Sequence, residues 1–136
     1  MSTADPARPR GRILLVEDNA EAAYYIVRVL TTMGHFEVVH LLDPAVALRR
    51  AIAEPWDLVL TDVDLPGMSG LDLLRALRQE VPALPVAVVT ADVIVGATAH
   101  ALRTGADAYL EKPVPPARLV AVAASLIAGA AAEPSA

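Results

Sequence analysis

Short apolar runs alternate with longer stretches of helical spacing five times along this chain, and this alternation narrows the possible folds more than any other property. Most runs are rich in Val, Leu or Ile without polar alternation, which is typical of strands buried on both faces of a parallel sheet. The five runs are Ile13–Val16, Phe36–His40, Leu58–Thr61, Val86–Thr90 and Ala108–Leu110. The pattern predicts an α/β fold with a doubly wound, parallel, five-stranded sheet and helices on both faces.

The stretches between the runs carry apolar residues at helical intervals. Ala23, Ile26 and Leu30 form one stripe in the first stretch, and Gly34 and Gly105 mark helix ends. The predicted helices are Ala20–Met33, Pro44–Ala53, a helix containing Leu71–Leu77, Ile94–Arg103 and Pro116–Ala128.

The length of 136 residues fits one compact domain, which we place at residues 12–130. Residues 1–11 are rich in Pro and Arg and are predicted to form a mobile leader, and residues 131–136 a frayed tail.

Charge and composition argue against several function classes. The chain has 11 basic and 16 acidic residues and a net charge of −5, which gives no reason to expect nucleic-acid binding. The longest apolar run, Leu119–Ala132, is shorter than the roughly 20 residues that span a membrane. The absence of cysteine suits a reducing compartment. We therefore expect a cytoplasmic protein without membrane contact.

Polar side chains follow four of the five predicted strands. Glu17 and Asp18 follow the first strand, Asp62 the third, Thr90 ends the fourth, and Lys112 follows the fifth. Because ligands of open α/β sheets bind beyond the carboxyl ends of the strands, we expect these side chains to converge there.

Such a cluster suits phosphoryl chemistry. Two carboxylates about 4 Å apart repel by roughly 4 kcal/mol at an effective dielectric constant of 20, so clustered acids stabilise a fold poorly. They do form a good site for Mg²⁺, which prefers oxygen ligands and shares its coordination with phosphate. A carboxylate can also attack a phosphoryl group, while Thr90 and Lys112 could bind the phosphoryl oxygens.

Four segments, in this order and spacing, resemble the receiver domains of two-component response regulators. They are ILLVEDN at 13–19, DLVLTDVDLPGMSGLDLL at 57–74, VAVVTA at 86–91 and GADAYLEKP at 105–113. The resemblance spans roughly residues 12–128 and implies a flavodoxin-like strand order, 2-1-3-4-5.

The resemblance also implies roles for individual residues. Asp62 matches the phosphoacceptor, and Glu17 with Asp18 the acidic pair that holds Mg²⁺. Asp62 would share the metal, and the backbone carbonyl of Asp64 would complete the protein ligands.

A second group matches the family's switch machinery. Thr90 corresponds to the switch hydroxyl, Tyr109 to the aromatic that changes rotamer, and Lys112 to the phosphate-pairing lysine. Ala91 is small, as the phosphate access route requires, and Pro113 suits the unusual peptide bond that follows the lysine.

Two acids at the rim are particular to this chain. Asp64 and Asp92 lie two residues beyond the acceptor and beyond the switch threonine. They could repel an anionic donor or orient water, so the sign of their effect on phosphoryl lifetime stays open.

The resemblance implies protein partners. A sensor histidine kinase or histidine phosphotransfer protein would dock on the first helix, which carries Tyr24 and Tyr25. With no output domain in these residues, a downstream protein target would receive the signal. The predicted fourth helix, 94–103, is apolar on most sides, which Ala-rich composition explains as well as an interface does. A homodimer through that helix, the fifth strand and the fifth helix is one possibility.

Other interpretations remain at this point. Asp62 and Asp64 resemble the acid pair of haloacid-dehalogenase-type phosphatases, although that pair follows the first strand in those enzymes. We expect no separate enzymatic activity, only self-catalysed phosphotransfer and autodephosphorylation. A receiver-like adapter that no longer switches is a further alternative. Tyr109 could be a packed aromatic, and the histidines His35, His40 and His100 surface or packing residues.

Overall fold

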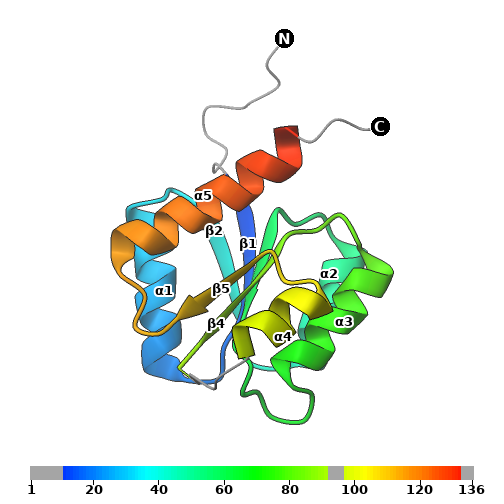
Figure 1. Cartoon of the computed structure of the whole chain (residues 1–136). Helices are drawn as coiled ribbons and strands as arrows, with labels where there is room; N and C mark the ends of the chain where they lie inside the picture. The colour runs from blue at the N-terminus through cyan, green and yellow to red at the C-terminus, as the bar shows by residue number, and fades with distance from the viewer. Residues whose placement is uncertain (1–10, 92–96, 133–136) are drawn as a thin grey trace.

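A computed structural model describes residues 11–91 and 97–132 of the chain. Strands and helices alternate along the described residues (Figure 1). The elements are β1 (Arg12–Val16), α1 (Ala20–Thr32), β2 (Glu37–Leu41), α2 (Pro44–Ala53), β3 (Leu58–Thr61), α3 (Gly70–Glu80), β4 (Val86–Thr90), α4 (Ala97–Thr104), β5 (Ala108–Glu111) and α5 (Pro116–Ala132).

All pairings in the five-stranded sheet are parallel, and the strand order is β2-β1-β3-β4-β5. This confirms the predicted fold class and strand order. The register places Val16 beside Thr61 and Thr90 beside Glu111, so the strands end at one common edge. Residues that directly follow β1, β3 and β5 therefore come close together in space.

Alternate residues of each strand enter two separate hydrophobic cores. Ile13 and Leu15 of β1 pack with α1 and α5, whereas Leu14 and Val16 pack with α2, α3 and α4. Figure 1 shows the two helix layers on opposite sides of the sheet. The central strands are buried on both faces, which explains why their sequences show no polar alternation.

Side-chain caps define where three helices begin. The side chains of Asn19, Asp43 and Ser69 accept hydrogen bonds from the first-turn N–H groups of α1, α2 and α3. The Asn19 cap directly follows Glu17 and Asp18, and the Ser69 cap ends the loop after β3 that carries Asp62. Helix capping thus helps to fix the loops that carry the site.

Several predicted boundaries differ from the structure. The edge strand β2 is half-buried and begins at Glu37, because Phe36 packs into the core just before it. α5 continues to Ala132, beyond the predicted end at Ala128. The predicted start of the fourth helix at Ile94 lies outside the described residues, as do residues 1–10 of the predicted leader and 133–136 of the predicted tail.

None of the helices in the described ranges combines the length and the apolar character needed to cross a membrane.

Candidate functional site

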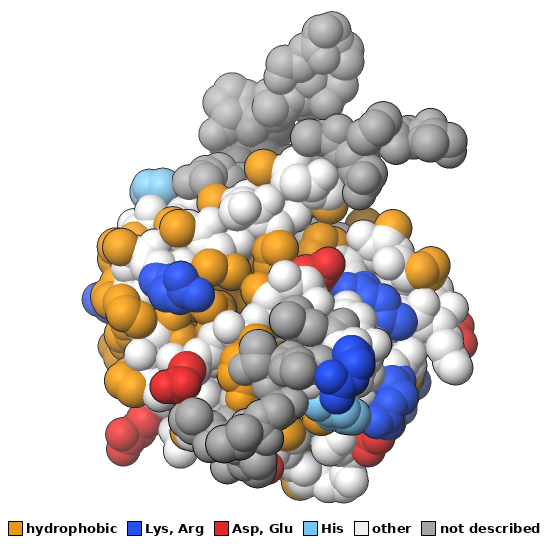
Figure 2. All heavy atoms as spheres, in the orientation of Figure 1, with side chains coloured by type: hydrophobic (Ala, Val, Ile, Leu, Met, Phe, Trp, Pro, Cys, Tyr) orange, Lys and Arg blue, Asp and Glu red, His pale blue; other side chains and the backbone are white. Residues whose placement is uncertain are grey.

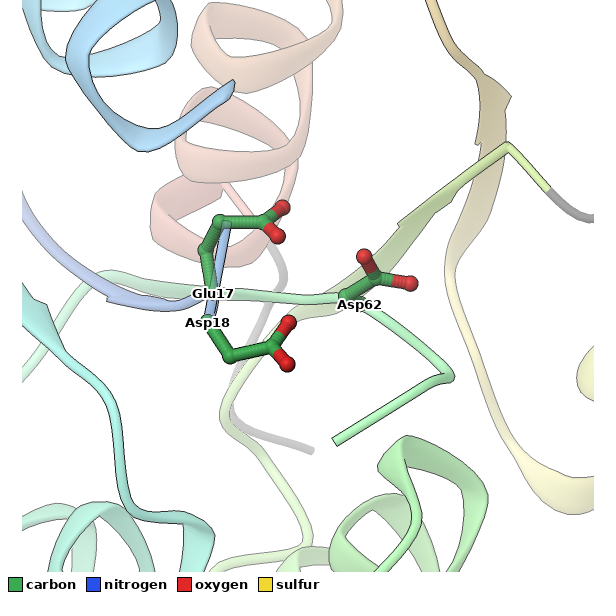
Figure 3. Close-up of side chains that lie close together, drawn as sticks. All are labelled: Glu17, Asp18 and Asp62. Carbon is green, nitrogen blue, oxygen red and sulfur yellow. The ribbon is translucent and has the colours of Figure 1, made fainter. Parts of the chain in front are cut away.

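Three carboxylates converge at the carboxyl edge of the sheet, and we call Glu17, Asp18 and Asp62 the acidic cluster. Each contributes an oxygen, and these oxygens all lie within 4.8 Å of one another. Figure 3 shows the side chains turned toward a common space. The Asp62 N–H donates to the carbonyl oxygen of Val16 at 3.1 Å, which ties the loop after β3 to the end of β1. The parallel ladder itself therefore brings together acids from two separate strands.

Lys112 directly follows the edge strand β5 and extends its side chain to this cluster. Its Nζ lies 2.6 Å from Glu17 Oε1 and 2.7 Å from Asp62 Oδ2. The Lys112 N–H donates to the carbonyl oxygen of Thr90 at 2.9 Å, so the residue extends the β4–β5 ladder by one step. The Lys112–Pro113 peptide bond is cis, as the resemblance implied.

The electrostatics of the cluster are unbalanced. Three carboxylates and one ammonium leave a net charge of −2, with Glu17 1% and Asp62 7% exposed and Asp18 open to solvent. Burial raises the pKa of Glu17, although hydrogen bonds from Lys112 and the Asn19 N–H oppose that shift. Burial alone would lower the pKa of Lys112, but its bonds to Asp62 and Glu17 outweigh burial and raise it. The lysine is held charged between two acids.

The other residues singled out in the sequence lie on β4 and β5, directly after β4, and in the loop after β3, apart from Asp92. Thr90 is buried at the end of β4, and Ala91 is exposed just beyond it. Tyr109 of β5 is half-buried against the core formed by α2, α3 and α4. Asp64 is exposed at the rim, and its N–H donates to Asp62 Oδ1 at 3.2 Å. Asp92 lies outside the described residues.

Two residues that the sequence analysis did not assign to the site also contact it. A Cβ on Gly70 would lie 1.9 Å from the carbonyl oxygen of Asp62, so only glycine permits this close approach. His40, expected to be a surface or packing residue, places its Nε2 at 2.6 Å from the carbonyl oxygen of Glu17. Gly70 lies in the motif that carries the resemblance, but no local pattern indicates either contact.

A doubly wound sheet of this order, with acids and a lysine at its carboxyl edge, defines a receiver-type fold and site. The chain belongs to the response regulator receiver domain family, whose model matches residues 13–124.

Among curated relatives, the chain is 39% identical over 117 residues to the "DNA-binding response regulator MtrA" of Mycolicibacterium paratuberculosis. That match covers 82% of this chain and 49% of the relative. The chain spans about half the length of the curated relatives it matches.

Solved structures show the same fold. The signal receiver domain of a LuxO repressor protein from Vibrio parahaemolyticus superposes with a TM-score of 0.83 at 28% identity, covering 91% of this chain and 93% of that one. The receiver domain of the sensor histidine kinase PA1611 from Pseudomonas aeruginosa gives a TM-score of 0.79 at 30% identity, covering 87% and 98%. That structure holds a magnesium ion coordinated in its active-site cleft.

Proposed function

We propose that the chain is a phosphorylation-dependent signalling switch of a two-component phosphorelay, and that Asp62 accepts the phosphoryl group. One observation carries this proposal: Asp62 lies in a cluster of three acids whose excess negative charge is only partly offset by Lys112. An arrangement that is electrostatically unfavourable by itself becomes favourable once a cation and a phosphoryl group occupy it.

The oxygen donors fit Mg²⁺. Glu17, Asp18 and Asp62 offer carboxylate oxygens within 4.8 Å of one another, and a hard divalent cation prefers such ligands. The backbone carbonyl of Asp64 would complete the protein ligands. When bound, Mg²⁺ supplies positive charge that offsets the negative charge on phosphoryl oxygens. The magnesium ion in the related receiver domain from Pseudomonas aeruginosa supports this assignment.

In the proposed step, a carboxylate oxygen of Asp62 forms a bond to phosphorus. At the same time, the bond between phosphorus and a histidine nitrogen, or the oxygen of a small donor, breaks, and its electron pair leaves with the donor. Lys112, already 2.7 Å from Asp62, would pair with a phosphoryl oxygen, and the Thr90 hydroxyl would donate to another. Tyr109 would then change rotamer behind Thr90 and alter the outer face of β5.

The rim residues would modulate this chemistry. Exposed Asp64 and Ala91 border the acceptor, and Asp92 belongs to the same proposed group. Small Ala91 keeps access open, whereas the acids either shorten or extend phosphoryl lifetime by acting on water or on the donor.

The proposed partners are proteins. A sensor histidine kinase or histidine phosphotransfer protein would dock on α1, where Tyr24 is exposed, and Tyr25 donates to the carbonyl oxygen of Val114 at 2.6 Å. A downstream protein target would read the phosphorylated surface.

A homodimer through α4, β5 and α5 remains a proposal. A largely apolar groove between β5 and α5 supports it; Ala108, Ala121, Val122 and Leu126 line it together with Arg118 and Ser125. Figure 2 shows hydrophobic side chains gathered on this side of the molecule. Contact with nucleic acid is not expected of these residues, although relatives about twice as long are described as DNA-binding regulators.

The test is phosphorylation with Mg²⁺ and a small phosphodonor, followed by intact-mass analysis. We expect the mass of one phosphoryl group on the wild type, removed by alkaline hydroxylamine, and none on Asp62→Asn. That variant should unfold within about 1 kcal/mol of the wild type, since it is nearly isosteric. Sustained hydrolysis of phosphate esters would instead favour a phosphatase, and no adduct at all would favour a non-switching adapter.

A further inference from the structure

His40 contacts the loop that carries two of the three acids. Its ring nitrogen Nε2 lies 2.6 Å from the backbone carbonyl oxygen of Glu17, and the ring is half-buried on edge strand β2. A carbonyl oxygen can only accept a hydrogen bond, so Nε2 must carry the proton. The contact is a directed hydrogen bond from β2 to the metal-binding loop.

The end of the sheet explains why the Glu17 carbonyl needs this donor. The Glu17 N–H still continues the β1–β2 ladder, because it donates to the carbonyl oxygen of Leu41 at 3.1 Å. β2 ends at Leu41, and the chain then turns toward Asp43, the N-cap of α2. In a regular parallel ladder the next backbone N–H of β2 would serve the Glu17 carbonyl. The His40 side chain donates to that carbonyl.

The remaining groups of Glu17 are held from other directions. Lys112 donates to Oε1 at 2.6 Å, and the Asn19 N–H donates to Oε2 at 3.1 Å. Asn19 in turn caps α1 through the Ala22 N–H. The His40 bond therefore fixes the backbone from which the Glu17 and Asp18 carboxylates project.

We propose that His40 is a positioning residue for the metal site, and that its Nε2–H bond to the Glu17 carbonyl sets the placement of both acids. This inference rests on the proposed function, because it assigns His40 to the Mg²⁺ site of the same switch. Residues that orient metal ligands from outside the coordination shell commonly change affinity by roughly 10-fold or more when lost.

The experiment compares four single variants by Mg²⁺ titration calorimetry and by phosphorylation rate at subsaturating Mg²⁺. His40→Leu removes the donor. His40→Gln places an amide N–H at the same number of bonds from the backbone, whereas the amide of His40→Asn is one bond shorter. His100→Leu, on the exposed side of α4, is the matched control for loss of a histidine.

We expect about 10-fold weaker Mg²⁺ binding for His40→Leu and His40→Asn, and values within about 2-fold of wild type for His40→Gln and His100→Leu. If His40→Leu does not fold, the comparison of Gln with Asn still decides. Equal Mg²⁺ affinity for Gln, Asn and wild type, whatever their thermal stability, would overturn the inference. Failure of the wild type to bind Mg²⁺ would instead overturn the proposed function.

Discussion

Charged side chains cluster at both ends of the β-sheet, but the two clusters differ in burial and in the balance of their charges. At the amino end, Arg12 pairs with Glu37 at 3.4 Å and with Glu54 at 3.2 Å. Arg50 pairs with Glu54 at 2.8 Å, and both guanidinium groups lie over the ring of Trp56. We call these five residues the amino-end cluster. Its charged groups are partly exposed, and each carboxylate faces an arginine.

In the acidic cluster at the carboxyl end, Glu17 and Asp62 are buried, Asp18 is exposed, and the cluster carries excess negative charge. Pairs that water screens contribute little to folding and reveal little about function. Buried charges of one sign oppose folding, and a fold that retains them gains something else from their placement, which in our proposal is a site for a cation and a phosphoryl group. Both ends contain ion pairs, so the two ends are distinguished by the burial of charged groups and by the excess of negative charge at the carboxyl end.

The largest expected difference in stability between the two ends comes from replacing a glycine by alanine, which adds one methyl group. Gly70→Ala would force a Cβ to within 1.9 Å of the Asp62 carbonyl oxygen, so we expect a loss of about 4 kcal/mol in the free energy of unfolding. Gly129 lies in the last turns of α5, on the side of the molecule where the strands begin, and has open space around it. Gly129→Ala should stabilise the helix by about 0.5 kcal/mol. Urea unfolding measures both, and equal effects would contradict the close approach at Gly70.

Removing the positive charge of Lys112 should reveal the charge imbalance in the acidic cluster. Lys112→Met leaves Glu17 and Asp62 buried without their shared partner, and we expect a loss of about 3 kcal/mol in Mg²⁺-free buffer. Added Mg²⁺ should restore much of that loss.

Arg50→Met is the matched change at the amino end. It should cost far less, because Glu54 keeps Arg12 and stays in contact with water. Mg²⁺ should not affect its stability. Equal losses for the two variants in Mg²⁺-free unfolding experiments would remove the distinction between the ends.

Neutralising acids should affect metal binding at one end alone. Glu17→Gln with Asp18→Asn removes two of the three carboxylates of the acidic cluster, and we expect Mg²⁺ affinity to fall about 100-fold, or about 2.7 kcal/mol. Glu37→Gln with Glu54→Gln removes the same charge at the amino end and should leave Mg²⁺ affinity unchanged. Titration calorimetry measures both, and parallel losses would mean that net charge, rather than these ligands, sets the affinity.

The architecture and the convergence of Glu17, Asp18 and Asp62 could be predicted from the sequence. Buried strands reveal themselves as apolar runs, and parallel strands bring the residues that follow them to one edge. Asp62, Glu17 and Lys112 could therefore be placed together from the sequence alone.

Gly70 and His40 could not be found in this way. The Gly70 approach depends on how tightly the loop after β3 folds back on α3, which hydrophobic periodicity does not encode. The His40 bond depends on where β2 ends. The sequence analysis ended this strand at His40, whereas β2 continues to Leu41, and the His40 ring donates to the Glu17 carbonyl.

The smallest expected difference concerns acid stability at the amino end. A hydrogen bond from Arg50, with further help from Arg12, lowers the pKa of Glu54 below its ordinary value of 4.5. A carboxyl group whose pKa is lowered by folding stabilises the protein above its unfolded-state pKa, and that contribution disappears as pH falls through the folded-state value. Glu54→Gln should therefore lose slightly less stability than wild type between about pH 5 and about pH 3. Urea midpoints across that range measure the difference, and a steeper acid loss in Glu54→Gln would show that the arginines at this end do not hold the carboxylate in its charged form.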